Sequence, residues 1–182
     1  MPVLVAAVAL TAALCLVNLV LMFGVVRRLR EHGRMLSEQK TLPEVTDLLP
    51  GEAPGAFTAV SAAGRQVRNA TGVQVAAFFS TKCSVCSERV GPFISYVSER
   101  KISRERVLAV IVGNGAPDGG VLTPYVDQLA GVATVCTEHD DDDGGVSTAF
   151  KVTGFPAFCV LDDDGLLTAS GYDPAMLPAL VR

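Results

Sequence analysis

The hydrophobic pattern of this chain changes abruptly after residue 26. Residues 3–26 carry no charged side chain, and Asn18 is the only strongly polar one among them. A membrane-spanning helix needs roughly 20 apolar residues to cross a hydrocarbon core of about 30 Å. The run lacks a basic start and stays apolar too long for a cleaved signal peptide. We therefore expect residues 1–26 to form an uncleaved transmembrane anchor.

Beyond residue 41 the apolar segments are short and are separated by turn-forming residues. The runs at 73–79 and 106–113 are long enough for buried strands. Taken together, the predicted strands are 57–60, 66–68, 73–79, 106–113, 132–136, 156–161 and 166–170, and the predicted helices are 87–96, 123–129, 147–151 and one beginning at Asp173. Because strands and helices alternate and a hairpin closes the chain, we expect 42–182 to be one α/β domain, a central mixed sheet with helices on both faces.

The charged side chains are unevenly distributed between these segments. The chain has 15 basic and 19 acidic side chains, of which five basic and two acidic ones lie in 27–41. The remaining ten basic and seventeen acidic side chains make 42–182 acidic, which argues against a nucleic-acid partner. The basic segment 27–41 suits a juxtamembrane linker among lipid headgroups. By the positive-inside rule it would also place the domain in the cytoplasm.

Two cysteines, Cys83 and Cys86, lie between the predicted strand 73–79 and the predicted helix 87–96. One helical turn brings side chains three residues apart close enough to form a disulfide. The free N–H groups and the positive dipole end of a helix N-terminus stabilise a thiolate on the first cysteine. The pattern predicts a redox site in which Cys83 is the nucleophile and Cys86 resolves the mixed disulfide.

Three sequence blocks resemble the thioredoxin superfamily, in particular its membrane-anchored, redoxin-type branch of TlpA-like disulfide oxidoreductases. They are GEAPGAFTAVSAAGRQV at 51–67, FFSTKCSVC at 78–86 and VTGFPAFCVLDDDGLL at 152–167. Within that branch, the chain is most similar to the accessory thioredoxin-like proteins of methylamine utilisation. The resemblance implies a thioredoxin-like fold behind the N-terminal helix, with Pro156 in a cis peptide bond against the cysteine pair. It also implies that Phe155 and Pro156 contact the extended backbone of a substrate.

Two positions depart from the pattern of that superfamily. Lys82 stands where the family has a tryptophan before the first cysteine, and an ammonium there would favour the Cys83 thiolate. Ala77, six residues before Cys83, stands where thioredoxins bury an acidic residue. We therefore expect Lys82 to modulate the site, and no internal base is evident for the transfer of protons.

The resemblance implies a membrane-tethered thiol–disulfide oxidoreductase that uses no dissociable cofactor and no metal. Its partners would be protein thiol or disulfide clients and a separate electron donor or acceptor. Disulfide chemistry is in demand outside the cytoplasm, so we expect a single-pass protein of the cell membrane with an extracytoplasmic domain. The basic linker 27–41 instead favours the cytoplasmic side.

Two other functions are open at this point. Ser80 lies three residues before Cys83, as in thiol peroxidases with antioxidant activity, although Ala76 replaces the proline expected ahead of it. Alternatively, the cysteine pair and His139 could hold copper, as in thioredoxin-like metallochaperones.

Two further cysteines and an acidic stretch are predicted to have structural rather than catalytic roles. Cys136 and Cys159 lie in apolar segments, where a cysteine behaves as a small buried hydrophobe. The acidic stretch 138–145 is predicted to be an exposed loop.

Overall fold

The computed structural model describes residues 22, 45–70, 72–113, 123–139 and 145–178. The chain divides into two units, Met1–Thr41 and Leu42–Arg182, and the fold below is that of the second. The predicted membrane anchor 1–26 and linker 27–41 lie outside the described residues, apart from Met22. Within the described part of the chain, no helix has the length and apolar character needed to cross a membrane.

The elements follow the predicted order along the chain. The strands are β1 (Thr58–Val60), β2 (Gln66–Arg68), β3 (Val75–Ser80), β4 (Val107–Val112), β5 (Thr134–Glu138), β6 (Ala157–Leu161) and β7 (Leu167–Gly171). The helices are α2 (Cys86–Glu99), α3 (Thr123–Leu129) and α4 (Val146–Ala149), with 3-10 turns η1 (Arg104–Arg106) and η2 (Pro174–Met176). The helix predicted from Asp173 is only the short turn η2, because the backbone is already extended again at Leu177.

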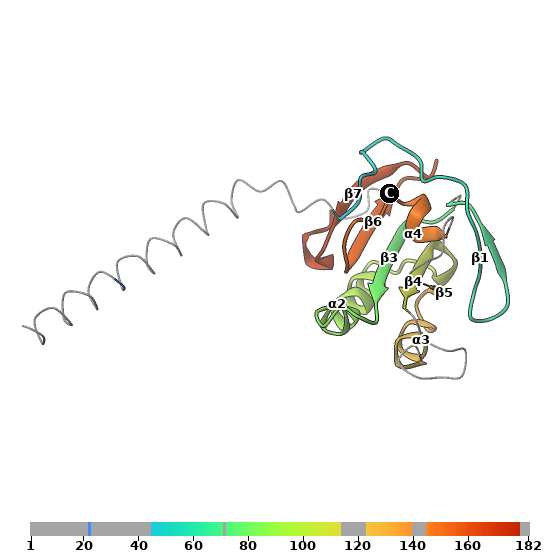
Figure 1. Ribbon diagram of the computed structural model, residues 1–182. Helices are drawn as coiled ribbons and strands as arrows, with labels where there is room; N and C mark the ends of the chain where they lie inside the picture. Colours follow the sequence, from blue (N-terminus) through green and yellow to red (C-terminus); the bar gives the residue numbers. More distant parts are fainter. Residues whose placement is uncertain (1–21, 23–44, 71, 114–122, 140–144, 179–182) are drawn as a thin grey trace, which may run out of the picture. The chain divides into compact units, whose positions relative to one another are not determined.

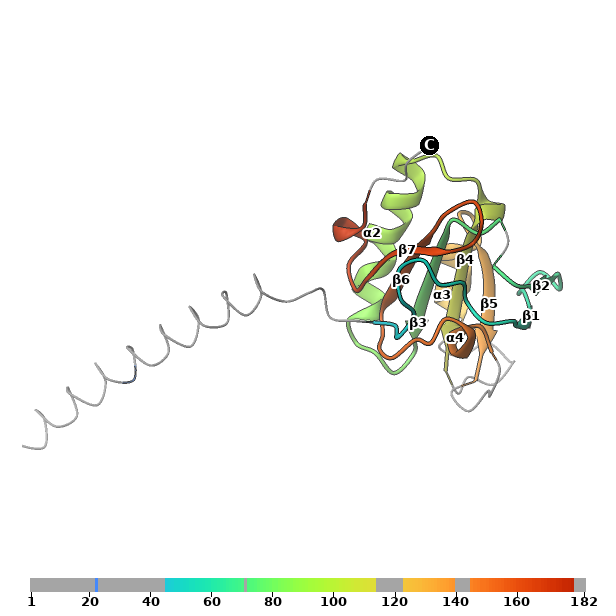
Figure 2. The ribbon, with the colours of Figure 1, turned by 90° about the horizontal axis from the view of Figure 1, so that it is seen from above.

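The central sheet is mixed, as predicted, with the strand order β5-β4-β3-β6-β7. β3, β4 and β5 run parallel, whereas β6 and β7 run antiparallel to their neighbours. Every residue of β3 and β4 is buried, which fits the continuous apolar runs of central strands covered on both faces. Figure 2 shows the strands side by side, with α4 close to one end of β5.

Alternate residues of the strands serve two separate cores, since successive side chains of a strand point to opposite faces. Ala76 and Phe78 of β3 pack with Phe150, which directly follows α4. Val75 and Phe79 face the other side, where Phe93 of α2 joins their cluster. In Figure 1, α2 and α3 lie on one side of the sheet and α4 on the other. The prediction of helices on both faces is confirmed.

The acidic stretch predicted as an exposed loop begins inside the sheet instead. Glu138, the last residue of β5, is only 6% exposed. Its carboxylate accepts hydrogen bonds from the Val146 N–H and from both the N–H (3.1 Å) and the hydroxyl (2.6 Å) of Ser147. A Cβ on Gly145 would lie 2.7 Å from Glu138 Oε1, so a larger residue there would displace the Glu138 carboxylate. The prediction was wrong for Glu138, because its charge is used to hold the N-terminus of α4.

Candidate active site

A tight turn between β3 and α2 presents the cysteine pair at the carboxyl edge of the sheet. β3 ends at Ser80, whose carbonyl accepts a hydrogen bond from the Cys83 N–H (3.2 Å). The Cys83 carbonyl in turn accepts from the Cys86 N–H (3.2 Å), and α2 begins at Cys86. The helix therefore starts within one residue of the prediction, with Cys83 just ahead of its first turn.

The two thiols lie in different environments, although both are free. Cys83 is half-buried, whereas Cys86 is fully buried. Burial raises the pKa of Cys86 to about 12, with further contributions from its hydrogen bond to Cys83 and from the charge of Cys83. The Ser80 N–H donates a hydrogen bond to the Cys86 sulfur at 3.4 Å, and this bond lowers the pKa of Cys86. Cys86 therefore keeps its proton at neutral pH, and Cys83 is the sulfur that a partner can reach.

The Phe155–Pro156 peptide bond is cis, and this prediction is confirmed. The Phe155 carbonyl accepts a hydrogen bond from the Cys83 thiol at 3.5 Å, so the loop before β6 lies directly against the Cys83 sulfur. Pro156 is buried, while the Phe155 side chain is 36% exposed. Val85, within the cysteine motif, is 44% exposed. The protein surface around Cys83 is thus partly apolar.

Three residues that precede the cysteine pair, Ala77, Ser80 and Lys82, differ in burial and contacts. The Lys82 side chain is exposed, and its effect on the thiolate stays a prediction. The Ser80 hydroxyl accepts a hydrogen bond from the Lys82 N–H (3.2 Å), so this hydroxyl takes part in the turn. Ala77 is fully buried in β3 and supplies no acid or base.

Tyr125 of α3 is a site residue that the sequence pattern did not reveal. Its ring lies 6.2 Å from that of Phe79, measured between centroids. Burial raises the pKa of Tyr125, and the charges of Cys86 and Cys83 raise it further, while a hydrogen bond to Ser87 lowers it. The Tyr125 phenol is therefore near enough to both sulfurs for their charges to affect its pKa. Only the packing of α3 beside α2 brings it there, so no local sequence signal could have identified it.

The copper site considered from the sequence is not assembled. Cys83, Cys86 and His139 are all described, and among the described residues no three His, Cys, Asp or Glu side chains are grouped as metal ligands would be. His139 lies at the end of β5 and lines a hollow beside Phe155.

Cys136 and Cys159 are buried free thiols, as predicted. Burial raises the pKa of Cys136 to about 11 and that of Cys159 to about 12. Cys136 pairs with Val110 in the sheet and Cys159 with Ala76, so neither belongs to the site around Cys83.

Comparisons with known proteins show the fold. No protein-family model matches the chain, and no curated protein sequence is similar to it. Among solved structures, the thioredoxin domain of a thiol-disulfide oxidoreductase from Bacteroides vulgatus superposes with a TM-score of 0.55 at 17% identity, covering 68% of this chain and 89% of that one.

Two further solved structures give the same result. A thio-disulfide isomerase from Thermus thermophilus has a TM-score of 0.53 at 21% identity, covering 69% of this chain and 87% of its own. A thiol:disulfide interchange protein from a Bacteroides species has a TM-score of 0.55 at 17% identity, covering 70% of this chain and 86% of its own. The domain therefore has the thioredoxin fold.

Proposed function

We propose that this protein is a membrane-tethered thiol–disulfide oxidoreductase that acts on protein clients through Cys83 and Cys86. One observation carries the proposal: a reachable thiol and a fully buried one lie together, with the carbonyl before a cis-proline 3.5 Å from the reachable sulfur. Since a fold alone does not define an activity, the argument rests on this geometry. The similar structures, described as thiol–disulfide oxidoreductase, isomerase and interchange protein, add support.

The chemistry divides between the two sulfurs. The Cys83 thiolate attacks a client disulfide, forms a mixed disulfide and expels one client thiolate. Cys86 then loses its proton and attacks the Cys83 sulfur, which forms the Cys83–Cys86 disulfide and releases the second client thiolate, which takes up a proton. The client gains two electrons, and a separate dithiol donor must reduce the pair again.

The change in charge at Cys83 helps the second step. The charge of Cys83 is one of the causes that raise the pKa of Cys86. Once Cys83 is in a mixed disulfide it carries no charge, so the pKa of Cys86 falls and its thiolate forms more easily. The pair is thereby arranged to resolve the mixed disulfide rather than to compete for the first attack.

Trapping tests the assigned roles. In the Cys86→Ser variant, a mixed disulfide between Cys83 and a client should accumulate and should disappear on addition of a reductant. Cys159→Ser is the control, since it removes a buried thiol outside the site and should not accumulate an adduct. An equal adduct in Cys83→Ser, or none in Cys86→Ser, would show that the roles are wrong.

The tether and its orientation belong to the same proposal. Residues 1–26 would anchor the chain, 27–41 would lie among headgroups, and 42–182 would face the extracytoplasmic side, where disulfides are exchanged. The finer similarity to the accessory proteins of methylamine utilisation also stays a hypothesis. A C-terminal alkaline phosphatase fusion, which is active only outside the cytoplasm, should be active. A fusion active only with a cytoplasmic reporter would reverse the orientation.

A further inference from the structure

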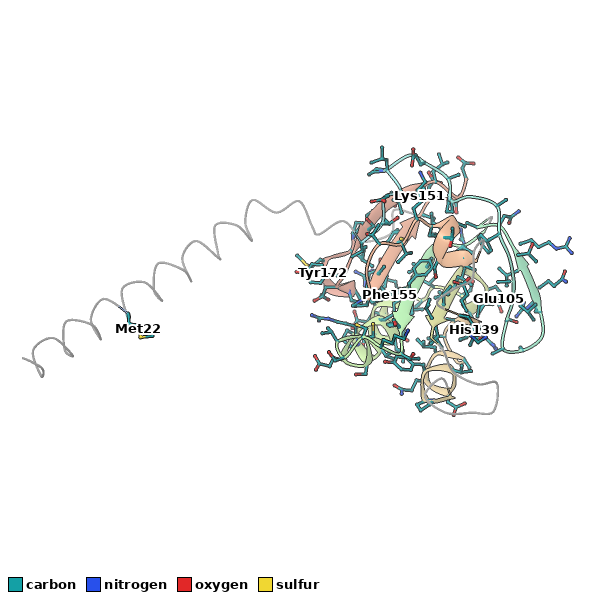
Figure 3. All side chains as sticks on the ribbon, viewed as in Figure 1. Met22, Glu105, His139, Lys151, Phe155 and Tyr172 are labelled. Atoms are coloured by element: carbon teal, nitrogen blue, oxygen red, sulfur yellow. The ribbon has the colours of Figure 1, made fainter. Side chains whose placement is uncertain are left out.

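A hollow of about 390 Å³ lies beside the cysteine pair at the same edge of the sheet. Val112 and Glu138, the last residues of β4 and β5, line it together with Phe155. Ligands of open α/β sheets bind outside the carboxyl ends of the strands, which is where this hollow opens. Figure 3 labels Phe155 and His139, two residues of this lining. Because the Phe155 carbonyl contacts the Cys83 thiol, one residue joins the hollow to the reactive sulfur.

The walls of the hollow are held by hydrogen bonds. The Asp47 N–H donates to the Lys151 carbonyl at 3.0 Å, and the Thr153 N–H donates to the Val45 carbonyl at 3.0 Å. Thr46 and Val152 form a β-bridge between the same two segments. The segment that leads to Phe155 is thus fixed against residues 45–47, and the hollow is part of the fold.

The charges around the hollow favour a cation. Asp47 and Glu138 contribute carboxylates, whereas the only lysine in the lining, Lys151, is paired with Glu52 at 3.2 Å. Glu138 is occupied by α4, but Asp47 is exposed, and among the described residues its carboxylate has no hydrogen bond or ion pair. Asp47 is therefore available for an added positive charge.

Part of the remaining lining is apolar. Val112, Val152 and Phe155 supply aliphatic and aromatic surface, beside the polar side chains of Ser147, Thr148 and Thr153. Lysine and arginine bury an apolar stem while their charged end reaches polar surroundings. A hollow with partly apolar walls and the exposed Asp47 carboxylate matches that shape and charge.

We propose that this hollow binds a lysine or arginine side chain of the disulfide client, carried by the extended segment next to the client's cysteine. The inference rests on the proposed function, because it names the kind of client that Cys83 would attack. Phe155 couples the two events: its carbonyl faces Cys83 while the residue lines the hollow.

Exchange kinetics with synthetic peptides test the inference on the full chain in detergent. Each peptide has one cysteine linked to 2-nitro-5-thiobenzoate; attack by the Cys83 thiolate forms the peptide–Cys83 disulfide and releases the coloured thiolate. At positions within four residues of that cysteine, lysine is compared with norleucine and with glutamate. We expect the lysine peptide to react roughly two- to fivefold faster than the norleucine peptide at one or more positions, as for a partly exposed ion pair.

Variants of Asp47 separate charge recognition from a structural effect. Asp47→Asn should bring the lysine-to-norleucine rate ratio to about one, and Asp47→Lys should make the glutamate peptide the fastest. Glu105→Gln is the matched control, since Glu105 is exposed and precedes β4 at the opposite edge of the sheet, and it should keep the wild-type ratio.

The outcomes distinguish this inference from the proposed function. If the protein reacts with bis(2-hydroxyethyl) disulfide but shows no preference for lysine at any position, or if Asp47→Lys leaves the preference unchanged, the inference is wrong and the oxidoreductase function stands. If no disulfide of any kind reacts with the reduced chain, both are wrong.

Discussion

At the scale of single residues, the site is defined by a difference in burial between two like thiols. Cys86 is fully buried, and its pKa is raised to about 12, so it keeps its proton at neutral pH. Cys83 is half-buried beside the Phe155 carbonyl and is open to a partner. Tyr125 adds a phenol near both sulfurs. The proposed order of attack, Cys83 first and Cys86 second, rests on this difference in exposure.

Tyr125→Phe tests whether the phenol supports the exchange. The variant keeps the ring against Phe79 but loses the hydroxyl that bonds Ser87 beside the sulfurs. We expect the second-order rate constant with 5,5′-dithiobis(2-nitrobenzoate) at pH 7 to fall roughly two- to tenfold, because one neutral hydrogen bond contributes about 0.5–1.5 kcal/mol. Tyr172→Phe, a tyrosine packed on the other core, should react like the wild type. Equal rates for wild type and Tyr125→Phe would remove Tyr125 from the site.

At the scale of secondary-structure elements, β5 and α4 form one unit that supports the loop before the cis-proline. The Glu138 carboxylate at the end of β5 accepts hydrogen bonds from the first N–H groups of α4. These N–H groups have no partner within the helix, and a nearby negative charge also complements the helix dipole. α4 is a short helix, so its position depends on this contact more than on its own hydrogen bonds.

Glu138→Gln should therefore destabilise the domain more than an ordinary surface substitution. Hydrogen bonds to a charged group contribute about 1.5–3 kcal/mol, and the amide of glutamine can replace only part of them. We expect the free energy of unfolding to fall by about 1–3 kcal/mol in urea denaturation followed by circular dichroism. The exposed Glu105→Gln should change it by less than about 0.5 kcal/mol. Equal effects of the two substitutions would contradict the role assigned to Glu138.

At the scale of the whole molecule, the sheet separates two cores, and each holds buried thiols. Cys159 lies in the core beside α4, and Cys86 in the core beneath α2. Burial raises the pKa of both to about 12 from an ordinary value of 9.0. The folded state therefore keeps protons that the unfolded chain releases in alkaline solution, which links global stability to pH.

The expected pH dependence has a definite sign. Below pH 9 both states hold the thiol protons, and the stabilisation is fully present. As the pH rises from 9 towards 12 only the unfolded state loses them, so the free energy of unfolding falls, by up to roughly 1.4 kcal/mol per pH unit for each thiol. Urea midpoints of the reduced protein at pH 8, 9 and 10 measure the decline. Cys159→Ala should show a shallower decline between pH 9 and 10, whatever its stability at pH 8. An unchanged slope would mean that Cys159 does not contribute.

The amino-acid sequence was enough to predict the mixed sheet and the strand–turn–helix around Cys83 and Cys86. Both follow from local patterns: continuous apolar runs predict central strands, and short motifs specify the turns. The cis bond at Pro156 was implied by the resemblance to the thioredoxin superfamily. Lys82 was also singled out from its position alone, and its role stays a prediction. The predicted anchor 1–26 was inferred the same way and, apart from Met22, lies outside the described residues.

Which distant groups meet depends on how the elements pack. The Phe155 carbonyl reaches Cys83 across 72 residues of sequence because β6 pairs with β3, and Tyr125 reaches the thiols because α3 packs beside α2. Glu138, in a run of acidic residues, was predicted to be solvated but is buried by α4. Local periodicity sets which face of an element is apolar, but it does not say which other element will cover that face. Burial, and with it the pKa of Cys86, was therefore decided by the fold.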